Sequence, residues 1–122
     1  MKQLFFFLIM NVIPILSFAQ TTFKPVQATI TDSQGRFTSQ SFDCPNMIVN
    51  DKGSYVLLSW GGENIPLNKD SKSPDIYVAS QTSSSGITMK FAAYRSSATR
   101  KIYLVICTTT NGSQKVEIDF KP

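Results

Sequence analysis

The sequence contains no histidine among its 122 residues. This absence excludes catalytic triads with a histidine base, zinc sites with imidazole ligands, and pH switches built on imidazole protonation. The sequence also lacks the P-loop spacing of Gly, Lys and Ser/Thr, the Gly-x-Ser-x-Gly nucleophile elbow, and any metal-ligand spacing. We therefore expect a protein that is not an enzyme and that uses neither a cofactor nor a metal ion.

Long apolar runs are equally scarce, and the one present stands at the N-terminus, behind Lys2. A positive residue, an apolar stretch and small residues before the cut form a secretory signal peptide, and Ala19 supplies the last small residue. A permanent membrane anchor needs roughly 20 consecutive apolar residues, whereas Asn11 and Pro14 interrupt this run. The sequence predicts that residues 1–19 are removed and that the protein is exported, to the periplasm or outside the cell.

Residues 20–122 are long enough for a single domain with one modest core. The formal net charge of the whole chain is +4, a mild excess that gives little information about partners. We expect no nucleic-acid partner and no integral membrane segment after cleavage. The oligomeric state is left open by the sequence.

Both cysteines, Cys44 and Cys107, follow the predicted cleavage site. An even pair in a small domain of an oxidising compartment predicts a disulfide bond. A redox-active thiol or two unrelated buried thiols are the alternatives, and a redox-active thiol favours a close cysteine pair or basic neighbours.

Short apolar alternations separated by turn residues recur along the predicted domain, and no stretch has helical periodicity. The turn signals include Asp32–Gly35, Asn50–Gly53 and Asn111-Gly112. About eight short strands at near-regular spacing predict an all-β fold, a small antiparallel β-sandwich or barrel. Within this fold, Tyr55–Trp60 is predicted as a central strand. The polar segment Glu63–Pro74 is predicted as a surface loop without regular structure.

Two features could bind a partner. Trp60, next to Gly61-Gly62, could present an aromatic face at a strand end, or it could pack in the core. Arg95, Arg100 and Lys101 bracket a short connection and could form a cationic patch for an anionic surface glycan, or simply a solvated loop. Glu117 and Asp119 alternate with apolar residues, which is typical of a solvated strand face.

Two segments resemble known families, each over a minority of the chain. Asp43-Cys44, Val56-Leu57-Leu58 and Ser84-Ser85-Gly86 follow an order that resembles C-type lysozyme inhibitors, small exported β-barrels with a disulfide. The Ser-Ala-Ser-Gly-Ala type of loop is not reproduced here, which puts that activity in doubt. The closing hairpin, Ile102 to Ile118, resembles the end of C-terminal sorting domains of Gram-negative secretion systems, which accompany a larger cargo. The sequence assigns no family.

The sequence thus predicts an exported, non-enzymatic binding protein for a protein or an anionic glycan. One alternative is a small inhibitor of a hydrolase such as lysozyme, with Glu63–Pro74 as the loop that enters an active site. Another is a structural subunit that pairs through an exposed sheet edge.

Overall fold

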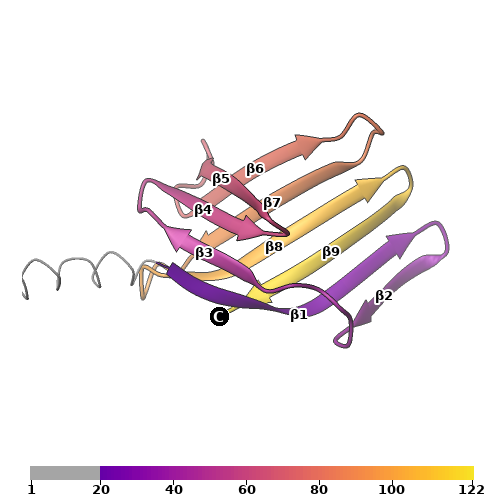
Figure 1. Ribbon diagram of the computed structural model, residues 1–122, viewed down its shortest axis with the longest axis horizontal. Coiled ribbons are helices and arrows are strands. Elements are labelled where there is room, and N and C mark those ends of the chain that lie inside the picture. Colours follow the sequence, from indigo (N-terminus) through magenta and orange to yellow (C-terminus); the bar gives the residue numbers. More distant parts are fainter. Residues whose placement is uncertain (1–19) are drawn as a thin grey trace, which may run out of the picture.

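A computed structural model describes residues 20–122, and the predicted signal peptide lies outside the described residues. The described chain forms nine strands that pair antiparallel with their neighbours (Figure 1). They are β1 (Gln20–Asp32), β2 (Gly35–Ser39), β3 (Met47–Asp51), β4 (Tyr55–Trp60), β5 (Glu63–Lys69), β6 (Ile76–Thr82), β7 (Thr88–Arg95), β8 (Ile102–Asn111) and β9 (Gln114–Lys121).

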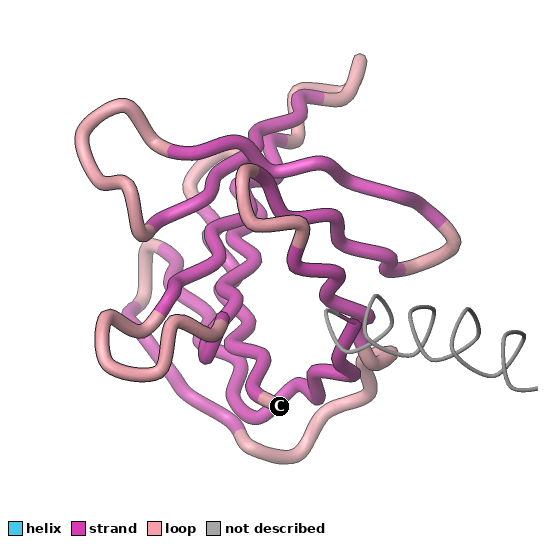
Figure 2. Tube along the Cα trace, turned by 90° about the vertical axis from the view of Figure 1, so that its left-hand side faces the viewer, coloured by secondary structure: helices cyan, strands magenta, loops and turns pink. Residues whose placement is uncertain are grey.

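Eight of these strands close into a barrel. Strands β3 to β9 follow one another in the sheet, and β1 pairs with both β3 and β9. Seen from one end, the strands form a ring around the core (Figure 2). The ninth strand, β2, lies outside the ring and pairs with β1. The predicted all-β class, with about eight strands in a sandwich or barrel, is confirmed, and the fold is a barrel.

The long strand β1 joins the two sides of the barrel. Residues 20–23 pair with β3, and residues 28–32 pair with β2 on the same edge of the strand. The register with β9 shifts between Pro25 and Gln27, the kind of irregularity that bends a strand and increases its twist. The bend lets one strand leave the short sheet of β3–β5 and continue in the long sheet of β6–β9.

The core fills the barrel with side chains from alternate positions of every barrel strand. Its largest fully buried members are Tyr77, Phe23, Phe91, Phe120, Met47, Leu58, Ile65, Leu67, Val49, Val56, Val105 and Cys107. Residues between these positions point outward, as the two-residue period of a strand requires. Each strand therefore has a defined outer face, and its residues can be read across the sheet from the register.

The prediction of an irregular loop at Glu63–Pro74 is wrong in its first half, because Glu63–Lys69 forms β5. Ile65 and Leu67 are fully buried, so the alternation of a half-buried strand is present among polar neighbours. Pro66 lies opposite Leu57 of β4, while β5 pairs with β6 only near its end, at Asn68 and Lys69. A proline is tolerated there because its missing N–H costs no ladder bond on an open edge.

The strands differ in length, so one end of the barrel is uneven. The hairpins of β6–β9, together with β1 and β2, extend well past the short strands β3–β5 (Figure 1). The connection between β2 and β3 covers the barrel end that this leaves, because Cys44 packs against the core and the Trp60 Nε1–H donates to the Pro45 carbonyl over 3.0 Å.

Candidate functional site

One stretch of the outer face of β6, β7 and β8 is apolar, which is unusual for the outside of a small barrel. The register places Ile76 opposite Tyr94, and Val78 opposite Ala92. It also places Leu104 opposite Tyr94, and Ile106 opposite Ala92. These six residues form what we call the outer patch: Ile76, Val78, Ala92, Tyr94, Leu104 and Ile106. Because the inner residues of the same strands are buried in the core, the three strands are apolar on both faces over the length of the outer patch.

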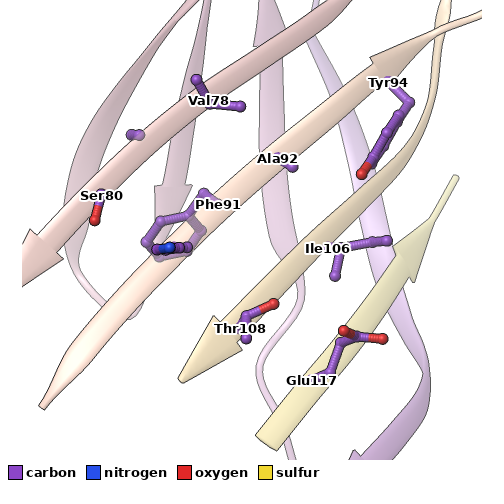
Figure 3. Close-up of a pocket in the computed structure, with 10 residues that line it drawn as sticks. Val78, Ser80, Phe91, Ala92, Tyr94, Ile106, Thr108 and Glu117 are labelled. Carbon is purple, nitrogen blue, oxygen red and sulfur yellow. The ribbon is translucent and has the colours of Figure 1, made fainter. Parts of the chain in front are cut away.

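A groove of about 610 Å³ runs across the outer patch (Figure 3). Its apolar lining includes Val78, Ala92, Tyr94 and Ile106. Ala92, whose side chain is a single methyl group, lies between Val78 and Ile106 on the adjacent strands. Val78 keeps 39% of its surface exposed, and the other members of the patch are half-buried. An apolar hollow of this size, rimmed by polar groups, is the usual form of a binding surface.

Polar residues line one side of the groove in a single cross-strand row. Ser80, Lys90, Thr108 and Glu117 follow one another across β6, β7, β8 and β9. The rim carries both signs of charge, with the exposed Lys90 on β7 and the half-buried Glu117 on β9. A partner that binds here therefore meets apolar contacts in the middle and one group of each charge at the side.

Asp119 stands at the edge of the outer patch, opposite Ile106. Burial raises the pKa of its carboxyl group above the ordinary value, the negative charge of Glu117 raises it further, and Lys121 opposes the change. A carboxylate held against an apolar surface is destabilised in its charged form. Since a raised folded-state pKa means that the folded state binds the proton more tightly, the charge of Asp119 lowers stability at neutral pH.

We expect Asp119→Asn to raise the free energy of unfolding at pH 7. The difference from the wild type should shrink as the pH falls through the raised pKa of Asp119 and should vanish below about pH 3.9, the ordinary value for aspartate. Urea unfolding at several pH values measures this. Glu63→Gln, at an exposed position of β5, is the control for the loss of a surface carboxylate. A variant that is less stable than the wild type at pH 7 would contradict the assignment.

Trp60 lies at the covered end of the barrel, and its ring packs onto the core. The ring meets Phe91 and Phe120 edge-on, with centroid distances of 6.1 and 5.8 Å. Its N–H is bonded to the Pro45 carbonyl. Trp60 also lines a surface hollow with Gly61 and Gly62, but the residue is half-buried and packs against the core. Of the two alternatives open from the sequence, the geometry favours packing over an aromatic platform.

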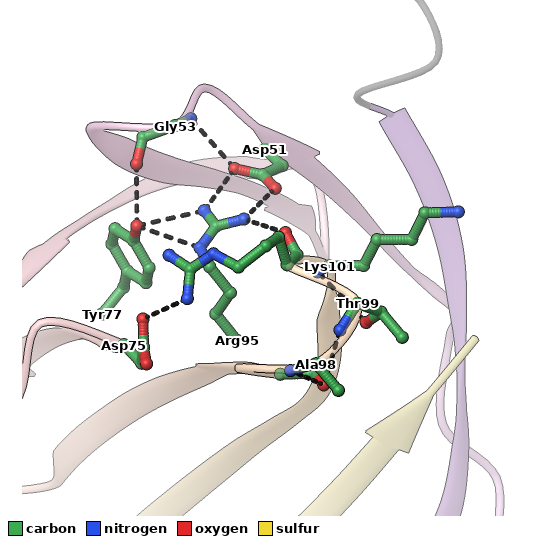
Figure 4. Close-up of polar contacts among 10 residues, drawn as sticks. Asp51, Gly53, Asp75, Tyr77, Arg95, Ala98, Thr99 and Lys101 are labelled. Carbon is green, nitrogen blue, oxygen red and sulfur yellow. Dashed lines mark hydrogen bonds and ion pairs between the residues drawn. The ribbon is translucent and has the colours of Figure 1, made fainter.

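The three predicted cations lie at one end of the barrel, and two of them are paired there with carboxylates (Figure 4). The Arg95 side chain is only 7% exposed and forms a bidentate ion pair with Asp51, with both N–O distances 2.7 Å. Its remaining N–H groups donate to the Tyr77 hydroxyl and to the Arg100 carbonyl. The Arg100 side chain pairs with Asp75 over 3.0 Å at the surface. Lys101 is exposed, so two of the three charges are directed at carboxylates of the same domain.

The ion pair of Arg95 and Asp51 closes the end of the barrel opposite Trp60. Arg95 also lies over the Tyr77 ring, 5.2 Å from its centroid, and the Tyr77 hydroxyl donates to the Gly53 carbonyl over 2.7 Å. Burial would raise the pKa of Asp51, but the hydrogen bonds from Arg95 and from the Gly53 amide hold it below its ordinary value. The Arg95 pKa is raised, chiefly by its bond to Asp51. The contacts of this cluster connect β3, β6 and β7.

The two cysteines are free thiols in this structure, which therefore does not contain the predicted disulfide. Both lie at the Trp60 end of the barrel, Cys107 inside the core and Cys44 packed against it. Burial raises the pKa of Cys107 to about 11, and the proximity of Cys44 contributes to that increase. Burial also raises the pKa of Cys44. Both sulfurs are therefore protonated at neutral pH, which makes a low-pKa reactive thiol a poor description of either residue.

The disulfide stays a prediction, and intact mass spectrometry tests it. Protein purified without reductant is expected to have lost two hydrogens and to contain no thiol that reacts with Ellman's reagent, even after denaturation. Cys44→Ser is the matched control, since it leaves one thiol that should react after denaturation. Two reactive thiols in the untreated wild type would contradict the predicted bond.

Among residues 20–122, no group of three or more His, Cys, Asp and Glu side chains is placed to hold a metal ion. In the same part of the chain, no helix is both long and apolar enough to cross a membrane. Comparisons with protein-family models, with curated proteins and with solved structures yield no match. The geometry of the described residues therefore carries the functional argument.

Sequence reasoning missed the outer patch. Thr88 and Lys90 share a face of β7 with Ala92 and Tyr94, and polar residues in this alternation are typical of a solvated face. The available signal was the absence of alternation in Phe91–Tyr94 and in Ile102–Ile106, where apolar residues follow one another on both faces. Two neighbouring strands without a polar face predict a sheet that is covered on both sides.

Proposed function

We propose that the protein is an exported, non-enzymatic binding protein that recognises a protein partner through the outer patch. The observation that supports this is the groove across β6–β8, which lies on the outside of a barrel whose core is already complete. The core needs no further apolar residues on the opposite face of these strands. Apolar side chains at such positions cost solubility, and they are expected where a partner covers them.

A protein partner fits the groove better than an anionic glycan. The lining combines aliphatic side chains with Tyr94, the mixture found in the centre of protein interfaces. The rim offers Lys90 together with Glu117 and the nearby Asp119, so a polyanion would meet two carboxylates beside one ammonium group. The other predicted cations are directed elsewhere, since Arg95 and Arg100 pair with Asp51 and Asp75.

The inhibitor alternative loses the element on which it depended. It required a protruding loop at Glu63–Pro74, and the first half of that segment is the strand β5 with Ile65 and Leu67 in the core. The short connection that remains, residues 70–75, is held by hydrogen bonds from the Asp70 amide to the Ile76 carbonyl and from the Ile76 amide to the Ser73 carbonyl. It offers a shorter protruding segment than the predicted loop did.

Site-specific photocrosslinking in cells that produce the protein tests the proposal. A benzophenone amino acid is placed at Leu104, inside the outer patch, or at Tyr55, which is 38% exposed on β4 at the opposite side of the ring. We expect a discrete, protease-sensitive adduct from position 104 and none from position 55. Ala92→Arg, which fills the groove, should remove the adduct.

Three results would contradict the proposal. They are the same adducts from both positions, an adduct from position 104 that Ala92→Arg leaves unchanged, and no adduct from either. Circular dichroism of Ala92→Arg serves as the folding control, because position 92 faces outward and a long side chain there need not disturb the core. Binding to an acidic oligosaccharide that Ala92→Arg abolishes would replace the protein partner with a glycan.

A further inference from the structure

A second surface, separate from the outer patch, is the free edge of β2. Within residues 20–122, β2 pairs with β1 alone and ends the order of strands in the sheet. All five of its residues are exposed. Closed barrels have no edges, and proteins with open edges usually protect them with short strands, charged side chains, proline, bulges or a covering segment. Here the edge Gly35–Ser39 contains no proline, and Phe37 is 64% exposed.

In the β1–β2 hairpin, hydrogen-bonded and non-hydrogen-bonded residue pairs alternate. Which pairs are which determines the backbone groups of β2 that are free. The hydroxyl oxygens of Thr29 and Thr38, which lie opposite each other, are 3.3 Å apart. Such close approach is typical of a non-hydrogen-bonded pair in an antiparallel ladder. With that alternation Ile30 and Phe37 exchange hydrogen bonds across the hairpin, while the N–H and C=O groups of Arg36 and Thr38 point to the free edge.

This arrangement is complementary to itself. When two copies of β2 run antiparallel with Phe37 at the twofold axis, Arg36 of one copy lies opposite Thr38 of the other. Both residues have free N–H and C=O groups, so two such pairs complete four backbone hydrogen bonds. The two Phe37 rings then face each other in the close, non-hydrogen-bonded position, where cross-strand aromatic pairs are favourable.

Charge and neighbouring side chains agree with this register. Arg36 meets a threonine and not its own copy, so no like charges face each other across the axis. On the other face of the sheet, Phe37 lies beside Ile30, which pairs with Val116 of β9. The two copies would therefore join four half-buried aliphatic side chains to the two phenylalanines in one continuous apolar strip.

We propose that the protein forms a symmetric dimer by pairing β2 with β2 of a second copy. In the twofold arrangement the β2 edge of each subunit is paired with that of the other. No β2 edge is left for a third copy, so assembly ends at the dimer. The two outer patches stay free, because they lie on β6–β8 and not on β2. The contact is smaller than a standard protein interface of about 1,600 Å², so we expect a dissociation constant in roughly the micromolar range. This inference does not depend on the proposed function.

Sedimentation velocity on residues 20–122, which include all nine strands described above, tests the dimer over a range of concentrations. The wild type is expected to double its mass as concentration rises. Phe37→Ser should raise the dissociation constant by at least about tenfold. Thr38→Pro should do the same by removing an edge N–H that the monomer does not use. Tyr103→Ser is the matched control, because Tyr103 is a comparably exposed aromatic residue, at 49%, on β8.

Hydrogen exchange identifies the interface independently of the variants. The amide protons of Arg36 and Thr38 should be unprotected in dilute protein and protected in concentrated protein, whereas the Phe37 amide should be protected in both. A protein that stays monomeric to about 1 mM would overturn the proposal. So would a ladder of larger oligomers, which requires a second, different edge, or a dimer that Phe37→Ser leaves unchanged. Ala92→Arg should leave the dimer intact, so failure of the outer patch and failure of the edge are distinguishable.

Discussion

Arg95→Met is expected to lower the free energy of unfolding by about 3 kcal/mol, because it leaves Asp51 without its partner inside the barrel end. Breaking a buried ion pair from one side typically costs about 3–5 kcal/mol. We expect the lower end of that range, since the Asp51 side chain is 24% exposed and water can reach it. The Tyr77 hydroxyl and the Arg100 carbonyl also lose donors, which adds to the loss. Urea unfolding of the variant and the wild type measures the difference.

Two further variants separate the buried charge from its packing. Asp51→Leu combined with Arg95→Met removes both charges and should recover most of the loss, because an apolar replacement of a whole pair is often neutral. Arg100→Met is the matched surface control. Its pair with Asp75 is exposed on both sides, at 61% and 40%, and should contribute less than about 1 kcal/mol. A loss from Arg95→Met no larger than that from Arg100→Met would show that the cluster is not a structural element.

The same cluster should make the protein sensitive to acid. The pKa of Asp51 is lowered in the folded state, so its charge adds stability above about pH 3.9, the ordinary value, and this stability is lost as the pH falls through the lowered pKa. The difference in unfolding free energy between the wild type and Asp51→Asn is therefore expected to be constant near neutral pH and to shrink below about pH 4. A constant difference down to pH 2 would contradict this origin.

The second large effect is expected from Phe120→Ala, which removes a fully buried ring near the end of the chain. Truncating a buried phenylalanine typically costs about 3–5 kcal/mol, and Phe120 has none of its surface exposed. It lies opposite Val105 and Pro25, so it packs where β8, β9 and β1 meet. Chemical denaturation gives the loss of stability.

Trp60 reports the same change by fluorescence. Its ring contacts Phe120 at a centroid distance of 5.8 Å, and it is the single tryptophan of the chain. The cavity left by Phe120→Ala should admit water and shift the emission to longer wavelength. Tyr103→Ala, at an exposed site, is expected to change neither stability nor emission. A Phe120→Ala protein with wild-type stability, or with unchanged emission, would mean that Trp60 does not pack on the core as described.

Turn chemistry made most of the strands predictable. Gly53 adopts a φ of +84° and Gly112 a φ of +62°, conformations that L residues rarely adopt, so the glycines after Asn50 and Asn111 marked hairpins whose strands then had to follow. Apolar alternation defined the inner face of β9 in the same way. These signals are local, and they identify strands without saying which distant strands pair. Whether the sheet closes into a barrel depends on the contact between β1 and β9, which lies beyond any local pattern.

The candidate site was harder to predict, because several residues have structural roles in the fold that differ from those that their residue types suggest. In the sequence, Arg95 looks like a free cation next to Arg100. In the structure, however, its side chain forms an ion pair with Asp51, which is distant in sequence. Pro66 appeared to end any regular structure, but it lies at an open edge where the missing N–H has no consequence. Ala92 is small and carried no sequence signal, although a small residue between larger ones is what makes the groove.

The pairing of β1 with β9 sets an order of events for folding. Strand β1 is synthesised first, but it cannot pair with β9 until the last strand has been made, because Lys24 lies opposite Lys121. Until then, one edge of β1 and its apolar inner face have no neighbour, and a barrel that needs contacts between such distant residues closes slowly, on the order of milliseconds to seconds. A chain cut short within β9 would therefore have its other strands but two further open edges, on β1 and β8, besides that of β2. It would be a substrate for aggregation or proteolysis.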